Sequence, residues 1–201
     1  MSSTLIPLAP GQIGTIVTSL EMRTPPPPAD GPVRSVLKLA RWPAPVDRDA
    51  YRALFRRVGQ PWLWRGRLVM DDRALATTLD AATTEVHVAS RRDGTAVGLI
   101  ELDFSEAGTC ELAYFGLAPE MTGHGHGNWL MAHALRLAWK SEGRPGVSRV
   151  WVHTCDLDHP GALGFYQRHG FVPFARAVEI YDDPRAVGIY PRESEARVVL
   201  L

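Results

Sequence analysis

The sequence predicts an α/β fold in which helices cover the faces of one sheet. Strand-like and helix-like segments follow one another in the order β, β, α, α, β, β, β, α, β, α, β. Hydrophobic residues make up 45% of the 201 residues, which is enough to build a sizeable core in a single domain over residues 1–201. No apolar stretch approaches the length that crosses a bilayer.

Charge gives no reason to expect a nucleic acid or an anionic membrane as partner, because 22 basic residues balance 22 acidic ones. The first residues lack a basic segment followed by an apolar run, so a cytoplasmic location is expected. Cys110 and Cys155 both fall within expected strands. We therefore interpret them as buried reduced thiols rather than as a disulfide or a nucleophile.

The N-terminal part is expected to supply two strands. Residues 12–22 are rich in β-branched side chains, and residues 35–42 form a second strand-like segment. Between them, Pro25 to Pro28 force an extended loop. The proline run suits either a partner-binding segment or a connection between paired strands, and the connection is the simpler interpretation.

Two helices are predicted next, at residues 47–59 and 71–82. The first has Asp47 as its N-cap and a glycine at its end. A hairpin then follows, with strands at residues 85–91 and 96–104. The later elements are a strand at 110–117, a helix ending near 142, a strand at 148–155, a helix at 160–169, a strand at 171–181 and a last strand at 196–201.

Three glycines stand between the strand at 110–117 and the helix that follows it. Gly123, Gly125 and Gly127 let main-chain N–H groups converge at the positive end of that helix, which predicts an anion cradle for a phosphate. The dinucleotide-binding pattern G-x-G-x-x-G does not match, because its third glycine is misplaced whether the count starts at Gly123 or at Gly125. A P-loop has Lys and then Ser or Thr at the positions where this sequence has Asn128 and Trp129. Neither nucleotide motif fits.

Two blocks resemble the GNAT superfamily of N-acetyltransferases. Residues 122–127 are similar to its acetyl-coenzyme A signature, Gln/Arg-x-x-Gly-x-Gly/Ala. Residues 156–171 are similar to its second block, Asn-x-x-Ala-x-x-x-Tyr-x-x-x-Gly-Phe, with His159 in place of Asn. The matching positions are Ala162, Tyr166, Gly170 and Phe171. The resemblance covers residues 95–175 and leaves residues 1–45 as an added N-terminal strand and proline-rich loop.

The resemblance implies a mixed, mostly antiparallel sheet of six to seven strands flanked by about four helices. It also implies transfer of an acetyl group from acetyl-CoA to a primary amine by direct attack, without a covalent enzyme intermediate. Two alternatives stay open: a non-catalytic acyl-CoA-binding or sensory module, and a transferase of a longer acyl group. The acceptor amine is not identified, and the strand at 171–181 leaves a homodimer possible.

The same resemblance assigns residues to the cofactor. Main-chain groups of the glycine loop would hold the pyrophosphate, and the end of the preceding strand would run beside the pantetheine arm. Thr122 and His124 replace the usual Gln/Arg and basic residue, which we expect to weaken affinity rather than abolish function. The cofactor-binding residues so assigned are Phe115, Leu117, Ala118, Gly123, His124, Gly125, His126, Gly127, Asn128 and His159.

Two residues are assigned to catalysis. Glu111 stands thirteen residues before His124, the register of the catalytic glutamate in histone-type members, and could instead be a surface residue. Tyr166 matches the tyrosine that protonates the departing thiolate in many members, and could instead only pack between helix and sheet.

The acceptor side is assigned more loosely. In GNAT folds the segment between the first two helices often forms a wall of the acceptor site, although its two indoles could simply pack onto the core. Asp156 and Asp158 follow a strand end near the expected reaction centre and would contact a cationic acceptor or cap a helix. No metal is expected, because the histidines near the loop lack acidic or cysteine partners. The substrate-binding candidates are Trp62, Trp64, Arg65 and Asp156.

Overall fold

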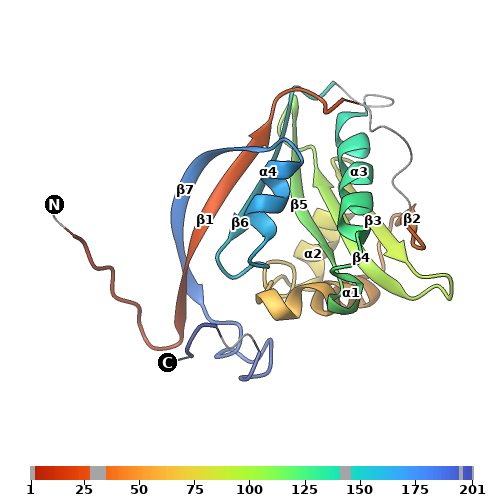
Figure 1. The fold of residues 1–201 in the computed structure, drawn as a ribbon. Coiled ribbons are helices and arrows are strands. Elements are labelled where there is room, and N and C mark those ends of the chain that lie inside the picture. Colours follow the sequence, from red (N-terminus) through yellow and green to blue (C-terminus); the bar gives the residue numbers. More distant parts are fainter. Residues whose placement is uncertain (1–2, 28–34, 141–145, 195–196, 201) are drawn as a thin grey trace.

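The computed structural model describes residues 3–27, 35–140, 146–194 and 197–200 (Figure 1). Within these residues the chain forms one seven-stranded sheet, four α-helices and two short 3₁₀ helices. Every strand pair is antiparallel except β5 with β6. The predicted fold class, a mixed and mostly antiparallel sheet flanked by about four helices, is confirmed.

The elements follow the predicted order. The strands are β1 (Gln12–Met22), β2 (Lys38–Arg41), β3 (Thr84–Ser90), β4 (Ala96–Asp103), β5 (Thr109–Leu117), β6 (Arg149–Cys155) and β7 (Val172–Asp182). The helices are α1 (Arg48–Gly59), η1 (Gln60–Trp62), α2 (Asp72–Leu79), η2 (Pro119–Met121), α3 (His126–Trp139) and α4 (Ala162–Arg168).

The sheet has the strand order β2-β3-β4-β5-β6-β1-β7, so the N-terminal strand lies between two late strands. The parallel pair β5–β6 is short: residues 109–111 pair with residues 149–151, and beyond them the two strands separate. Figure 1 shows β1 and β7 curving away from the rest of the sheet. The result is a V-shaped opening between β5 and β6 at their carboxyl ends.

Helices cover both faces of the sheet, and each face has its own hydrophobic core. α3 and α4 pack on one face with a large core that includes Leu20, Leu130 and Tyr166. α1 and α2 pack on the other face with a second core around Tyr51 and Phe55. Figure 1 shows α4 and α3 on either side of β5, and α3 contacts β5 and β4.

A β-bulge at Ala113 shifts which β5 side chains point to each face of the sheet. Tyr114 pairs with Glu101 and Leu112 pairs with Leu102, so Ala113 is an extra residue on β5. Leu112 therefore contributes to the α3 core while Tyr114 contributes to the α1 core. Glu111, next to Leu112, lies on the same face as Tyr114 and Gly116, although simple alternation would separate them.

Two predicted elements differ from the structure. α3 ends at Trp139 rather than near 142, and residues 141–145 lie outside the described residues. The last strand predicted at 196–201 is wrong for its described part, because residues 197–200 form no strand. Arg197 instead donates to the carbonyls of Leu157 and Asp158, which holds the tail against the loop before α4. Among the described helices, none is both long and apolar enough to cross a membrane.

Candidate active site

A cleft of about 400 Å³ opens where β5 and β6 separate. It is bordered by the end of β5, the glycine loop, the loop between β6 and α4, and α4 itself. Both sequence blocks therefore meet in one place. The residues lining it are Trp62, Trp64, Phe115, Gly116, Leu117, Thr122, Gly123, Gly125, Gly127, Asn128, Asp158, His159, Gly161, Ala162, Phe165, Tyr166 and Arg168.

The glycine loop is built as an anion cradle. Gly123 and Gly125 have φ angles of 78° and 79°, which residues with a Cβ rarely adopt. Gly125 is the N-cap of α3, and no side chain caps this helix end. The first N–H groups of α3 therefore face the cleft without a side-chain acceptor, at the positive end of the helix dipole. This arrangement suits a pyrophosphate.

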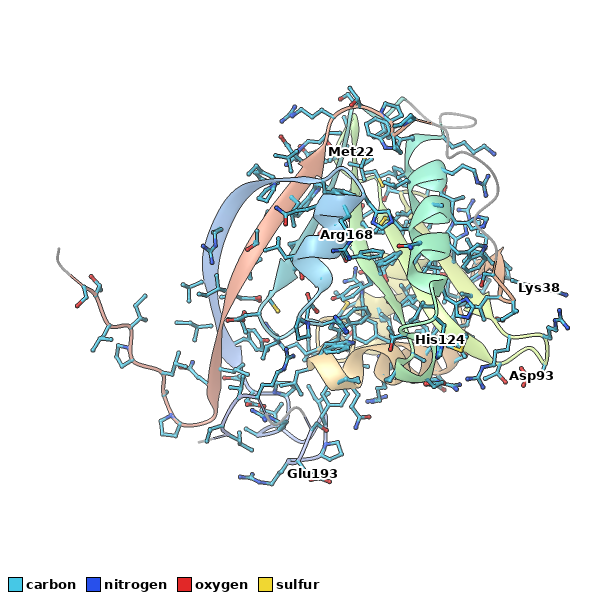
Figure 2. The ribbon with its side chains drawn as sticks, viewed as in Figure 1. Met22, Lys38, Asp93, His124, Arg168 and Glu193 are labelled. Atoms are coloured by element: carbon cyan, nitrogen blue, oxygen red, sulfur yellow. The ribbon has the colours of Figure 1, made fainter. Side chains whose placement is uncertain are left out.

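Most of the residues predicted to bind the cofactor line this cleft, but three do not. Ala118 is buried and donates its N–H to the carbonyl of Val97 at 2.8 Å, so that N–H is already used inside the sheet. The Nδ1 atom of His126 lies 2.9 Å from the hydroxyl of Ser35. His124 is exposed at the N-terminal end of α3, as Figure 2 shows.

The end of β5 presents free main-chain donors to the opening. Since the N–H of Ala118 points toward β4, the N–H of Leu117 points to the opposite edge, toward β6. β6 does not pair with β5 at this level, because the ladder ends at Glu111 and Trp151. The Leu117 N–H is therefore placed to donate to a carbonyl in the cleft.

Tyr166 stands on α4 with its ring buried among aromatic neighbours. Its ring centroid lies 6.4 Å from that of Phe115 and 5.8 Å from that of Phe171. Burial, with a smaller contribution from the Asp158 charge, raises the pKa of Tyr166 well above its ordinary value. The phenol is therefore protonated at neutral pH and can donate a proton into the cleft.

His159 has a defined hydrogen-bonding role. Its Nδ1 accepts the N–H of Gly161 at 3.0 Å, so the ring nitrogen that remains, Nε2, is the one that carries a proton in the neutral imidazole. The ring of Trp62 lies edge-on at a centroid distance of 5.4 Å. His159 thus offers a donor at the position where the family pattern has the amide of Asn.

Trp64 and Asp158 connect the two loops that border the cleft. The indole Nε1–H donates to Asp158 Oδ1 at 3.2 Å. Asp158 Oδ2 also accepts the Thr154 hydroxyl at 2.7 Å and the Cys155 N–H at 3.1 Å. Asp158 is the one carboxylate among the lining residues of this cleft.

The other two acceptor-side candidates lie outside the cleft lining. Arg65 stacks over the ring of Tyr181 at 3.9 Å and reaches Glu179 at 3.4 Å. Asp156 is exposed and accepts the N–H of Ile16 at 3.1 Å, which joins the loop to β1. Arg65 therefore lies on the α1 side of the opening, and Asp156 makes a structural contact.

Glu111 also lies outside the cleft lining, at the point where β5 and β6 separate. Its Oε1 lies 3.5 Å from Nδ1 of His153 on β6. Both side chains are on the face that carries Tyr114 and Gly116. His153 was not identified from the sequence. The alternation of β6 nevertheless indicates its orientation, because Val150 and Val152 face the core under α3 and α4 and His153 must lie on the opposite face.

A second charged group missed from the sequence lies behind this face. Glu101 is fully buried in β4, where it accepts hydrogen bonds from the Tyr51 hydroxyl and from the guanidinium of Arg67. The guanidinium in turn lies 5.1 Å from the ring centroid of Tyr114. The sequence feature that could have identified Glu101 is that it is the one charged residue in the otherwise apolar segment 97–102.

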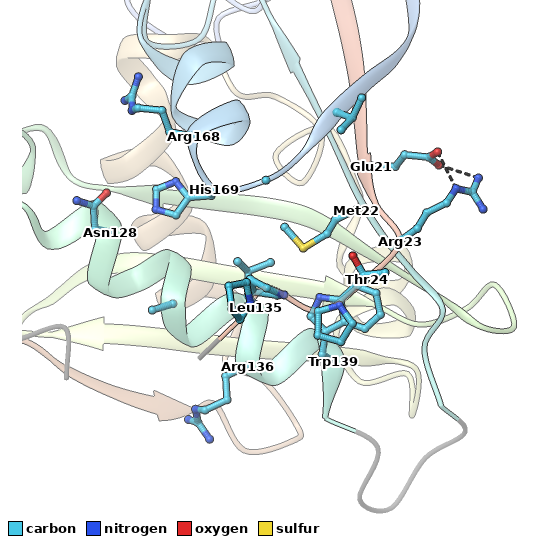
Figure 3. A pocket seen from close by; sticks show the side chains of 16 residues that line it. Glu21, Met22, Arg23, Thr24, Asn128, Leu135, Arg136, Trp139, Arg168 and His169 are labelled. Carbon is cyan, nitrogen blue, oxygen red and sulfur yellow. Dashed lines mark hydrogen bonds and ion pairs between the residues drawn. The ribbon is translucent and has the colours of Figure 1, made fainter. Parts of the chain in front are cut away.

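A larger hollow of about 1210 Å³ adjoins the cleft and shares Asn128 and Arg168 with it. Figure 3 shows these two residues on α3 and α4, with His169 between them. Arg136 lies further along α3 on the same hollow. The hollow thus extends the cleft between α3 and α4 with cationic side chains at its border.

Neither a metal centre nor a reactive thiol is evident in the described part of the chain. No group of three or more His, Cys, Asp or Glu side chains there could hold a metal ion. Burial raises the pKa of Cys155 to about 11, which makes it a poor nucleophile at neutral pH. Cys110 and Cys155 are both reduced cysteines, and Cys110 is buried.

Comparison with known proteins agrees with this geometry. The profile of the Acetyltransferase (GNAT) family matches residues 48–171, which is more than half of the chain. None of the curated proteins resembles the sequence closely enough to count as a match.

Solved structures show the same fold at low identity. A GCN5-related N-acetyltransferase from Sphaerobacter thermophilus matches with a TM-score of 0.57 and 16% identity, over 84% of this chain and 51% of that chain. A tandem GNAT protein from the clavulanic acid biosynthesis pathway has a TM-score of 0.60 and 17% identity, over 84% and 54%. A GNAT family acetyltransferase from Elizabethkingia anophelis, with acetyl-CoA bound, has a TM-score of 0.52 and 15% identity, over 71% and 80%.

The chain thus spans about half the length of the first two of these structures. Because the family profile covers most of α1 to α4, including the glycine loop and Tyr166, the assignment rests on the elements that build the cleft. The chain belongs to the GNAT family of acetyltransferases.

Proposed function

We propose that the protein transfers an acetyl group from acetyl-CoA to a primary amine by direct attack. The observation that carries the proposal is the cleft itself, in which the open N-terminus of α3, the Leu117 N–H and the Tyr166 hydroxyl group come together. An anion cradle, a carbonyl donor and a proton donor are the three requirements of this reaction.

The cofactor would be held largely by main-chain groups. The N–H groups of residues 123–127 would bind the pyrophosphate, whereas the Asn128 N–H already donates to the Gly125 carbonyl at 3.2 Å. The pantetheine arm would lie along the β6-facing edge of β5. His159 would donate to a pantetheine amide. Because Thr122 rather than a Gln or Arg lines the cradle, affinity depends on these main-chain donors and on Arg168.

The nucleotide end would extend over the larger hollow between α3 and α4. Coenzyme A carries a further phosphate on its ribose, and Arg136 and Arg168 supply positive charge at that hollow. Asn128, which lines both cavities, would stand where the two halves of the molecule meet.

The chemistry follows from the residues around the opening. The Leu117 N–H would stabilise the negative charge that develops on the thioester oxygen, and Tyr166 would give its proton to the departing sulfur. Glu111 would draw the proton from the acceptor ammonium, directly or through water. A base is needed because an alkylammonium, with a pKa of roughly 10, has no free lone pair at neutral pH.

The test is release of free thiol from acetyl-CoA by the purified protein in the presence of a panel of primary amines. Acetylated product should be identified by mass in the same reactions. A rate that saturates with one class of amine supports the proposal. Thiol release that does not depend on any amine, or no release by folded protein, would contradict it.

A further inference from the structure

The Glu111–His153 pair occupies a distinctive place in the sheet. Glu111 is the last residue of β5 to pair with β6, opposite Trp151, and His153 is two residues further along β6. The pair therefore stands at the apex of the opening whose other end is the cofactor cleft. Both side chains face the α1 side, where Arg65 and the Trp64 loop lie.

The geometry gives the two imidazole nitrogens different surroundings. Nδ1 lies 3.5 Å from Glu111 Oε1, within ion-pair range when the ring is protonated. The side chain of His153 is 47% exposed and that of Glu111 only 25%. Nε2 lies on the other side of the ring, and no described residue is recorded as its hydrogen-bond partner, so this nitrogen can accept a proton.

The charges around the ring favour its protonated form. Carboxylates act on it from three elements: Glu111 of β5, Asp158 of the loop before α4, and Glu179 of β7. Glu179 is partly neutralised by Arg65 at 3.4 Å. Glu111 makes the largest contribution and raises the pKa of His153, while desolvation acts in the opposite direction.

We propose that His153 is the group that accepts the proton of the acceptor ammonium, and that Glu111 orients its ring and stabilises the imidazolium. This inference rests on the proposed function and changes one assignment in it, because His153 rather than Glu111 receives the proton. An imidazole suits the task better than a carboxylate, because its ordinary pKa of about 6.5 lies nearer to neutrality than that of Glu, about 4.3. The arrangement uses a carboxylate on Nδ1 and a proton acceptor at Nε2.

The step balances without a further reactant. The ammonium gives one proton through intervening water to His153 Nε2, because the pair lies outside the cleft lining, and the freed nitrogen lone pair forms the new C–N bond at the thioester carbonyl carbon. The C–S bond breaks, and the sulfur takes the hydroxyl proton of Tyr166. The nitrogen of the collapsing intermediate loses its second proton through water to the tyrosinate, and the imidazolium releases its proton to water, so each turnover yields amide, free thiol and one proton.

The test compares kcat/KM as a function of pH for the protein of residues 1–201 and three variants, with one amine for all of them. His153→Gln should lower kcat/KM by roughly 100-fold or more and lose the rise between about pH 6 and 8. Glu111→Gln should keep that rise but move it to lower pH, because the imidazolium loses its stabilising carboxylate. His133→Gln is the same change on α3, at a residue outside the lining of the cleft, and should behave like the wild type.

A second readout does not require turnover. NMR titration of the His153 ring should show a higher pKa in the wild type than in Glu111→Gln. The inference is overturned if the His153 titration is the same in both proteins, or if the pH rise survives in His153→Gln and disappears in Glu111→Gln. If the wild type acetylates no amine, the proposed function fails and this inference fails with it; normal turnover with an unchanged His153→Gln profile removes the inference alone.

Discussion

The indole of Trp64 donates to the carboxylate of Asp158 at 3.2 Å, and this bond joins the loop after α1 to the loop before α4 across the cleft. The Trp64 main chain is held as well, because its carbonyl accepts the Tyr190 hydroxyl at 2.6 Å. The loop proposed to form a wall of the acceptor site is therefore held to the loop that borders the cleft before α4. We expect a substitution at Trp64 to change the KM for the amine more than the affinity for acetyl-CoA.

Trp64→Phe keeps an aromatic ring but removes the donor to Asp158. We expect the KM for the amine to rise several-fold while the affinity for acetyl-CoA changes little, because the glycine cradle is untouched. The free energy of unfolding should fall by about 0.5–1.5 kcal/mol. Steady-state kinetics and urea unfolding measure both effects. An unchanged amine KM would show that this indole does not shape the acceptor site.

Gly116→Ala should distort the same wall. A Cβ there would lie 2.7 Å from a methyl group of Val58 and 3.0 Å from the Trp64 ring, closer than packed atoms approach. We expect a loss of about 1–3 kcal/mol in the free energy of unfolding. Gly146→Ala is the matched control, because a Cβ there meets no atom within 4 Å. Equal stability of the two variants would contradict the packing at Gly116.

Tyr166→Phe removes the hydroxyl and keeps the buried ring. If the hydroxyl protonates the departing sulfur, kcat should fall by roughly 100-fold or more while the dissociation constant for acetyl-CoA stays close to that of the wild type. Calorimetry and thiol release separate the two quantities. A variant that turns over at the wild-type rate would leave Tyr166 with a packing role only.

Arg67→Leu should be one of the most destabilising changes behind the acceptor face. It leaves the fully buried carboxylate of Glu101 without its cationic partner, with only the Tyr51 hydroxyl as a donor. The expected loss is about 3–5 kcal/mol. Arg57→Leu, which breaks the exposed pair with Glu120, should cost less than about 1 kcal/mol. Chemical denaturation of both variants decides whether burial makes this difference.

Arg168→Gln should weaken binding of coenzyme A more than binding of dephospho-coenzyme A, if the ribose phosphate lies over the hollow between α3 and α4. The difference should shrink as salt is added, because Arg168 is exposed. Arg73→Gln on α2, an exposed arginine outside both cavities, serves as the control. An equal loss for both ligands would place the ribose phosphate elsewhere.

Local pattern was sufficient to predict most of the fold. β1 was predicted with its observed bounds because β-branched residues and turn residues mark it, and Asp47 caps α1 as expected, accepting the N–H groups of residues 49 and 50. The position of β1 between β6 and β7 could not be predicted from such signals. The position of β1 depends on contacts between residues 128 or more positions apart.

The candidate site was predictable where it follows a spaced motif and not where it depends on register. The glycine loop and Tyr166 were identified from spacing, and both line the cleft. The bulge at Ala113 determines on which face of the sheet Glu111 lies relative to Tyr114. No residue in β5 indicates from the sequence that a bulge forms there. His153 was missed because the feature that distinguishes it is its contact with Glu111, which lies on another strand and is close only in the folded structure.

The central claim is tested most directly by calorimetric titration of the purified protein with acetyl-CoA, alongside Gly125→Val. The wild type should bind at one saturable site. The variant should bind much more weakly, because valine does not tolerate the φ of 79° that opens the N-terminus of α3. Absence of binding by folded wild type, or equal binding by both proteins, would contradict the account of the cleft as an acetyl-CoA site.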